Sequence, residues 1–198
     1  LLKKMKKLSL LDCTDNEIET LNAFGKEVKL MKVYLDNNKI KEIPGIEENG
    51  LKYFFGWNDL ETFSCTNNLL TKVPNIFNAK SDFVMGTVDF SNNQIDGFED
   101  GENHRGINAS TVNLHHNKFT EFPKLLFEKE SPMQTLNLSA NGMTTIPKGA
   151  LKGKTCLEYL ASLDLTYNKL SSLTDDFYVI NMPILYGLDL SYNRFSKF

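Results

Sequence analysis

The sequence predicts an α/β repeat solenoid in which short parallel strands stack side by side along the chain. The main observation is an eleven-residue pattern, L-x-x-L-x-L-x-x-N-x-L with L any apolar residue, that recurs at intervals of 22 to 30 residues. Each copy contains the period-2 alternation of a strand with one buried face. A second apolar position follows each copy at residue fourteen of the repeat. Such a period is typical of architectures whose neighbouring units bury a shared core.

The clearest copy spans residues 30–40, where Leu30, Val33, Leu35, Asn38 and Ile40 hold the fixed positions. We place eight frames in residues 1–198, starting at residues 8, 30, 60, 85, 109, 133, 160 and 185. Each frame has an asparagine at its ninth position: Asn16, Asn38, Asn68, Asn93, Asn117, Asn141, Asn168 and Asn193. We expect one array of about eight repeats with both ends truncated, because the chain has no initiator methionine and stops partway through a repeat.

The returning half of the repeat is short and frequently carries proline at its fifteenth position, as in Ile43-Pro44, Val73-Pro74, Phe122-Pro123 and Ile146-Pro147. With the eight frames, this resembles the typical class of leucine-rich repeat. The resemblance implies a curved horseshoe segment with a parallel sheet on its concave face and short irregular or 3-10 segments on its convex face. It also suggests a bacterial surface or secreted member.

The ninth-position asparagine is expected to turn inward where the strand ends. There its amide can hydrogen-bond the backbone groups that the turn leaves unpaired, so that neighbouring asparagines form a ladder. Cys13 and Cys65 hold the inward sixth position, where other frames carry leucine or phenylalanine. We expect both thiols to act as small core hydrophobes, because two repeats of strand spacing place them beyond disulfide reach.

Composition and motifs argue against several functions. The net charge is −3 and only two of the 22 basic residues are arginine, which disfavours nucleic acid as a partner. No apolar run approaches the roughly 20 residues of a membrane span. The sequence has no Cys-x-x-Cys, His-Glu-x-x-His, Gly-x-Ser-x-Gly, phosphate-loop or dinucleotide motif. We therefore expect no metal, no cofactor and no catalytic residues, and interpret the chain as a non-enzyme.

The third, fifth, seventh and eighth positions of each frame should point to the concave side or its rim. These positions are rich in hydroxyls, amides and carboxylates, and Lys32 is the one full positive charge among them. Such a face suits a basic or hydrogen-bonding protein segment, or a polysaccharide; ordinary exposed strand residues without a ligand are the alternative. The predicted partner-binding residues are Asp12, Tyr34, Asp36, Ser64, Asp89, Asn113, His115, Asn137, Asp164, Tyr167, Asp189 and Tyr192.

Three further questions stay open from the sequence. The aromatic segment Tyr53–Trp57 lies in the longest repeat and is either part of the core or a binding hot spot. An extracellular or cell-surface recognition module is the leading interpretation, with a cytoplasmic scaffold or effector, or the targeting part of a larger enzyme, as alternatives. We also expect self-association through uncapped apolar ends, because terminal repeats need a polar cap.

Overall fold

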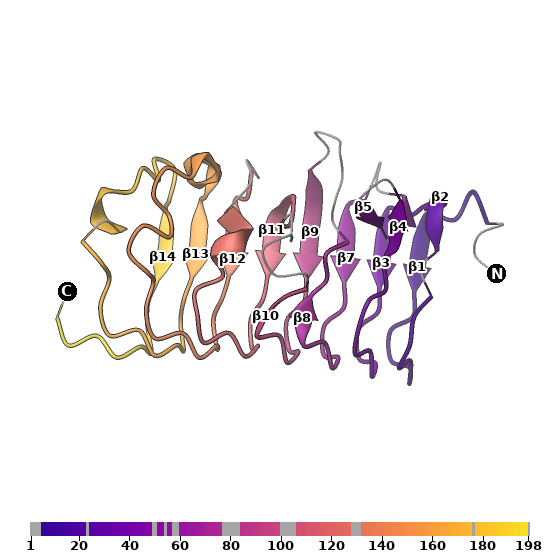
Figure 1. Ribbon diagram of the computed structural model, residues 1–198, viewed down its shortest axis with the longest axis horizontal. Helices are drawn as coiled ribbons and strands as arrows, with labels where there is room; N and C mark the ends of the chain where they lie inside the picture. The colour runs from indigo at the N-terminus through magenta and orange to yellow at the C-terminus, as the bar shows by residue number, and fades with distance from the viewer. Residues whose placement is uncertain are drawn as a thin grey trace.

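The computed structural model describes residues 5–22, 24–48, 51–53, 55–56, 60–76, 84–99, 106–127, 132–175 and 177–197. Its centre is an eight-stranded sheet in which every pairing is parallel. Figure 1 shows these strands side by side along the long axis of a curved solenoid, in chain order. They are β1 Leu10–Asp12, β3 Lys32–Tyr34, β7 Thr62–Ser64, β9 Met85–Asp89, β11 Ala109–Asn113, β12 Thr135–Asn137, β13 Ser162–Asp164 and β14 Gly187–Asp189.

The strand register aligns equivalent repeat positions, so the fourth residue of one frame pairs with the fourth residue of the next. Val88, Val112 and Leu136 form one such row, and each is completely buried. Burial of one face explains why this register is specified, since a one-residue slip would turn every apolar side chain toward water. Leu188 in the last strand is 37% exposed because no further strand in the structure covers it.

The asparagine ladder is present along the whole sheet, as the sequence predicts. Asn93 is representative: its Nδ2 donates to the carbonyls of Cys65, Phe90 and Ser91, and its Oδ1 accepts from the amide of Leu70. One side chain thus satisfies buried backbone groups in its own repeat and in the preceding one. Equivalent bonds are made by Asn38, Asn68, Asn117, Asn141, Asn168 and Asn193.

Every frame also ends its strand with a residue in the left-handed region. The eighth positions have φ between 50° and 57°, although none is glycine: Asp15, Asn37, Asn67, Asn92, His116, Ala140, Tyr167 and Tyr192. Asparagine and aspartate tolerate this conformation, whereas alanine and tyrosine pay a steric cost of about 1–2 kcal/mol. In the C-terminal half of the chain, the turn geometry of the repeat therefore overrides the backbone preference of the residue at the eighth position.

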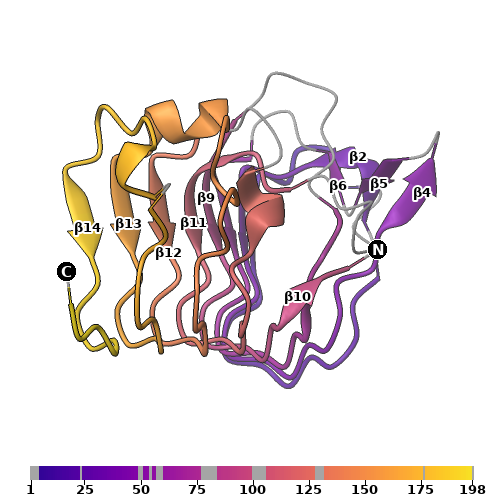
Figure 2. The same ribbon diagram turned by 60° about the vertical axis from the view of Figure 1, so that its left-hand side comes forward.

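The returning segments differ between the two halves of the chain. Toward the C-terminus they contain the expected 3-10 helices, η3 Lys124–Phe127, η4 Thr155–Tyr159 and η5 Phe177–Val179. Figure 2 shows η3 set apart from the sheet, and η4 at the end of the sheet where β13 begins. None of the helices in the described part of the chain is long and apolar enough to cross a bilayer.

Toward the N-terminus the expectation of irregular or 3-10 returning segments is incomplete, because three small sheets occur there. β2 Gly25–Lys29 pairs in parallel with β6 Phe55–Gly56, and β8 Lys72–Val73 with β10 Gly97–Phe98. An antiparallel hairpin joins β4 Ile46–Glu48 to β5 Leu51–Tyr53 inside the longest repeat. β8 and β10 hold the same repeat positions, so adjacent returning segments satisfy each other's backbone groups.

Candidate partner-binding face

The fifth positions of the frames lie in one column across the face of the sheet that points away from the core. Strand register pairs Asp89 with Asn113, Asn113 with Asn137, Asn137 with Asp164 and Asp164 with Asp189. We call these five residues the acceptor column. Because parallel strands lie about 4.8 Å apart, the column presents a regularly spaced row of carboxylate and amide groups. The same column continues toward the N-terminus through Ser64, Tyr34 and Asp12.

Each member of the acceptor column also holds the turn that follows its strand. Its Oδ1 accepts a hydrogen bond from the backbone amide two residues later, at 2.8–3.0 Å in all five cases. Asp12 makes the same bond to Thr14. This is the Asx turn, in which a side chain imitates a backbone turn. This role was not predicted from the sequence, although Asp or Asn two residues before a Ser or Thr is a local signal for it at each of these positions except Asn113.

In the third repeat the fifth position is Ser64, and the preceding repeat supplies the acceptor for the following turn. Oδ1 of Asp36 accepts from the Ser64 hydroxyl at 2.6 Å and from the Thr66 amide at 2.7 Å. Ser64 is only 8% exposed. Asp36 and Ser64 were both expected to contact a partner, and the structure places them in a hydrogen-bonded group within the sheet. Tyr34 is half-buried beside Ser64 on the adjoining strand.

Hydrogen bonds favour the ionised form of two fifth-position carboxylates, one at each end of the sheet. Hydrogen bonds from the Ser191 hydroxyl and amide lower the pKa of Asp189, and those from Thr14 lower the pKa of Asp12. Asp89 Oδ2 accepts a hydrogen bond from Asn113 Nδ2 at 2.9 Å, which links the first two residues of the acceptor column. Lys32 forms an ion pair with Glu61 at 3.4 Å near the N-terminal end of the sheet.

The row of eighth-position side chains beside the acceptor column changes from polar to aromatic along the solenoid. In the first repeats it is polar: Asn37 Nδ2 donates to Asp15 Oδ1 at 2.7 Å, and Asn67 Nδ2 donates to Asn37 Oδ1 at 2.8 Å. In the last two repeats it is aromatic. Tyr167 and Tyr192 stack with ring centroids 4.1 Å apart and planes within 7°, and both are more than half exposed. A hydrogen bond to Tyr192 raises the pKa of Tyr167.

The remaining predicted residue, His115, faces a neighbouring repeat. Its Nδ1 lies 2.8 Å from the Ser139 hydroxyl, and its ring meets that of His116 edge to face at 5.7 Å. Within the ranges that the structure describes, no group of three His, Cys, Asp or Glu side chains could hold a metal ion. The choice between core and binding site for Tyr53–Trp57 lies outside the residues whose side chains the structure describes.

The two thiols of the sixth position are both reduced in the structure. Cys65 is completely buried in the core, as expected for a small hydrophobe, and burial strongly raises its pKa. Cys13 is only half-buried and packs against the core from the first repeat, and its pKa is raised by desolvation and by Asp12. The difference follows from position, since Cys13 lies at the edge of the sheet and Cys65 between two neighbouring strands.

Comparison with known proteins supports the interpretation of the repeats. No protein-family profile matches the chain. The sequence is 28% identical to Tsukushi from Gallus gallus over 93% of this chain, and 28% identical to lumican from Bos taurus over 85% of it. The chain spans 54% of Tsukushi and 39% of lumican.

Solved structures of two leucine-rich repeat proteins resemble the fold across the whole chain. The one from Bacteroides thetaiotaomicron has a TM-score of 0.88 and 43% identity, and the one from Bacteroides eggerthii has 0.86 and 42%. This chain covers 24% and 33% of those two proteins. Proteins with these repeats generally mediate protein–protein interaction and are generally non-catalytic. On its repeated frames, its parallel sheet and its asparagine ladder, this chain belongs to the leucine-rich-repeat proteins.

Proposed function

We propose that the chain is a non-catalytic recognition module that binds a protein partner through the concave face of its sheet. The acceptor column carries this proposal, because it places three carboxylates and two amides in register on five consecutive strands. The partner that suits this face is a protein segment rich in lysine, arginine or other hydrogen-bond donors. Complementary potentials of this kind determine specificity and the rate of association.

Pre-organisation supports the same proposal. The Oδ1 bond to the following turn fixes each side chain in one rotamer before a partner arrives, for example Asp164 on Thr166 and Asp189 on Ser191. The described part of the chain makes no hydrogen bond to Oδ2 of these two carboxylates. A partner that donates to Oδ2 therefore loses little side-chain entropy, which is one of the main costs of association.

The two adjacent carboxylates give the partner a specific place to bind. Asp164 and Asp189 are paired in register, so two negative charges lie side by side on neighbouring strands. Like charges at that spacing repel each other, and a cationic side chain between them relieves the repulsion. We place the strongest contact here, beside the exposed Tyr167 and Tyr192 pair.

The chain itself offers a conservative test. Repeats five and six have asparagine at this position and keep the same turn, through Asn113 and Asn137. The double variant Asp164→Asn/Asp189→Asn should therefore retain the fold and lose only charge, because the hydrogen bonds of both carboxylates are made to Oδ1. A matched control changes two exposed acids of the returning segments, Glu42→Gln/Glu121→Gln.

Partners are captured from the source organism with the immobilised chain, identified by mass spectrometry, and titrated at low and high salt. We expect the column variant to weaken binding by at least about tenfold at low salt, with a smaller difference at high salt because the ions screen exposed charges. The control variant should bind like the wild type. Equal affinity of the wild type and the column variant refutes the proposed face. Capture that is abolished by periodate oxidation of the extract assigns a polysaccharide instead.

We further propose that this partner is met outside the cell or at the cell surface, as the broad use of such repeats in recognition suggests. The cytoplasm is the alternative, as is a role in targeting a larger enzyme. Fractionation of the source organism with an antibody against the chain separates the two compartments, and the mass of the detected protein shows whether further domains are attached.

A further inference from the structure

A groove of about 660 Å³ lies on the side of the core away from the acceptor column, where the returning segments of the sixth and seventh repeats meet. The sixth repeat contributes the turns at 148–154 and the helix η4, and the seventh contributes Ile180 and Asn181. The volume falls within the roughly 300–1,000 Å³ typical of small-molecule sites. Nothing in the repeat pattern requires these residues, because none occupies a fixed frame position.

The floor of the groove is apolar. Leu151 and Leu157 are 2% and 1% exposed and belong to the core, while Ile180 packs against it and remains partly exposed. Two glycines with positive φ, Gly149 at 78° and Gly153 at 68°, shape the turns that border the groove. Glycine adopts this conformation without strain, so these turns can fold back on themselves over a very short stretch of chain.

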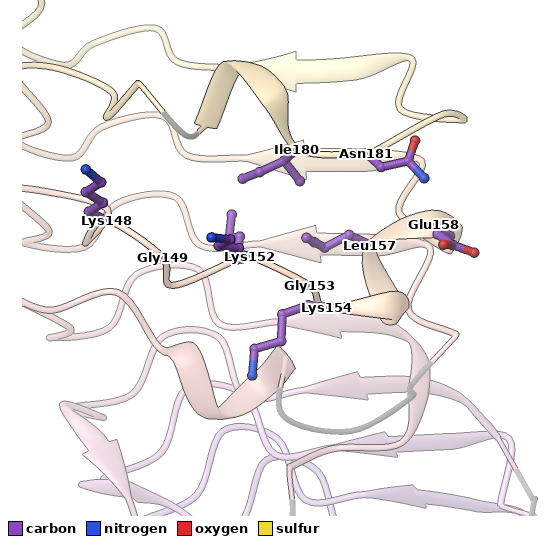
Figure 3. A pocket seen from close by; sticks show the side chains of 10 residues that line it. Lys148, Gly149, Lys152, Gly153, Lys154, Leu157, Glu158, Ile180 and Asn181 are labelled. Atoms are coloured by element: carbon purple, nitrogen blue, oxygen red, sulfur yellow. The ribbon is translucent and has the colours of Figure 1, made fainter.

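Charge is distributed unevenly around this floor. Figure 3 shows Lys148 and Lys152 toward one end of the groove, Glu158 and Asn181 at the other, and Leu157 and Ile180 between them. Lys154 also lines the groove. Lys148 and Lys152 are exposed, so their ammonium groups can reach a ligand in the groove without first leaving a buried position.

We propose that this groove binds a free fatty acid, with the carboxylate at Lys148 and Lys152 and the aliphatic tail along Leu157 and Ile180. The apolar floor favours a hydrocarbon chain, which gains about 25 cal/mol for each Å² that leaves water. The lysines favour an anionic head group, and Glu158 at the far end repels one, so the charges fix the direction in which the ligand lies. A bare anion lacks the apolar contacts, and a neutral or cationic amphiphile lacks the charge match.

The test uses the full chain and sodium dodecanoate below its micelle concentration, titrated by calorimetry. Butyrate has the head group without the tail, and dodecyltrimethylammonium has the tail with the opposite charge. We expect saturable binding of dodecanoate at one site and no measurable binding of the other two. Equal binding of dodecyltrimethylammonium overturns the proposal, because it shows apolar adsorption without charge recognition. Binding of butyrate alone overturns it as well.

Two variants locate the site. Lys148→Glu/Lys152→Glu should weaken dodecanoate binding by about tenfold or more, the loss expected when charge-assisted contacts are removed. The matched control Lys118→Glu/Lys169→Glu reverses exposed lysines just after the asparagine ladder and should bind like the wild type. Circular dichroism confirms that both variants are folded. If the groove variant binds dodecanoate as tightly as the control, the ligand lies elsewhere and the assignment is wrong.

Discussion

Asn117 occupies the middle of the asparagine ladder, and its replacement by alanine measures how much the ladder stabilises the fold. Its Nδ2 donates to the carbonyls of Phe90, Leu114 and His115 at 3.0–3.3 Å, and its Oδ1 accepts from the Ile95 amide at 2.9 Å. Phe90, Leu114 and Ile95 are completely buried. Water therefore cannot replace the lost side chain without opening the core.

The cost of Asn117→Ala follows from these partners. The Ile95 amide is left without an acceptor, and an unsatisfied buried donor costs about 1–3 kcal/mol. The two buried carbonyls lose a donor, at about 0.5–1.5 kcal/mol each. We expect the free energy of unfolding to fall by about 3–4 kcal/mol, a large share of the roughly 5–15 kcal/mol that stabilises a typical domain.

Asn16→Ala is the matched control, because it removes the same residue type at the start of the ladder. Asn16 is exposed and its Nδ2 donates only to the carbonyls of Cys13 and Thr14, so water can take its place. Its cost should stay near about 0.5 kcal/mol, as for other surface substitutions. Urea unfolding followed by circular dichroism measures both variants. Equal costs for Asn16→Ala and Asn117→Ala refute the argument that burial of the ladder stabilises the solenoid.

Five further predictions concern the strand-ending turns, the two thiols, Asp189 and the last strand of the sheet. Ala140 has φ 50°, so Ala140→Gly should raise the free energy of unfolding by about 1 kcal/mol, whereas Ala161→Gly should lower it; thermal melts compare the two. The third cysteine of the sequence is first removed by Cys156→Ser. Dithiobis(nitrobenzoate) should then label Cys13 much faster than Cys65 in the folded chain, because Cys13 is half-buried and Cys65 is completely buried. Burial raises the pKa of Cys65, so the free energy of unfolding should fall as the pH rises above the unfolded thiol pKa of about 8.5. Unfolding curves at several pH values check this, because the fall should be smaller in Cys65→Ala than in the wild type. Ser191→Ala should raise the pKa of Asp189 toward its ordinary value in a carboxyl-carbon NMR titration, and an unchanged pKa contradicts the assigned cause. Leu188→Glu should reduce self-association of the 198-residue chain in sedimentation experiments, because Leu188 is 37% exposed at the open end of the sheet.

Much of the fold could be predicted from the sequence because the repeat fixes the inward positions. Val88, Val112 and Leu136 must be apolar to share one core, and Asn93 and Asn117 must carry both a donor and an acceptor to satisfy two repeats at once. Those requirements recur in every frame and are therefore visible as a pattern. The small sheets of the N-terminal returning segments were not predictable, because their pairing depends on which irregular segments become neighbours after the strands have stacked.

The candidate site was only partly accessible to the same reasoning. The fifth-position column could be read from the frames, but its bonds to the following turns depend on the left-handed eighth position. Asn92 suggests that conformation, whereas Ala140 and Tyr192 give no sign of it. The groove was missed altogether, although Lys148-Gly149 and Lys152-Gly153 repeat the same pair of residues within a few positions. Its other wall, Ile180, comes from the next repeat, and no local signal connects the two.

The two proposed surfaces carry opposite charge and lie on different sides of the apolar core. Their separation makes the two binding tests independent. The acceptor column presents carboxylates on the face of the sheet that points away from the core, while the groove presents lysines on the returning segments, with the apolar core between the two. A charge change on one face should act weakly on the other, because exposed charges are screened beyond about 10 Å at ordinary salt. The column variant should therefore bind dodecanoate normally, and the groove variant should capture the protein partner normally. If either variant loses both activities, the ligands share one site or the fold has changed, and a urea unfolding curve of that variant distinguishes these causes.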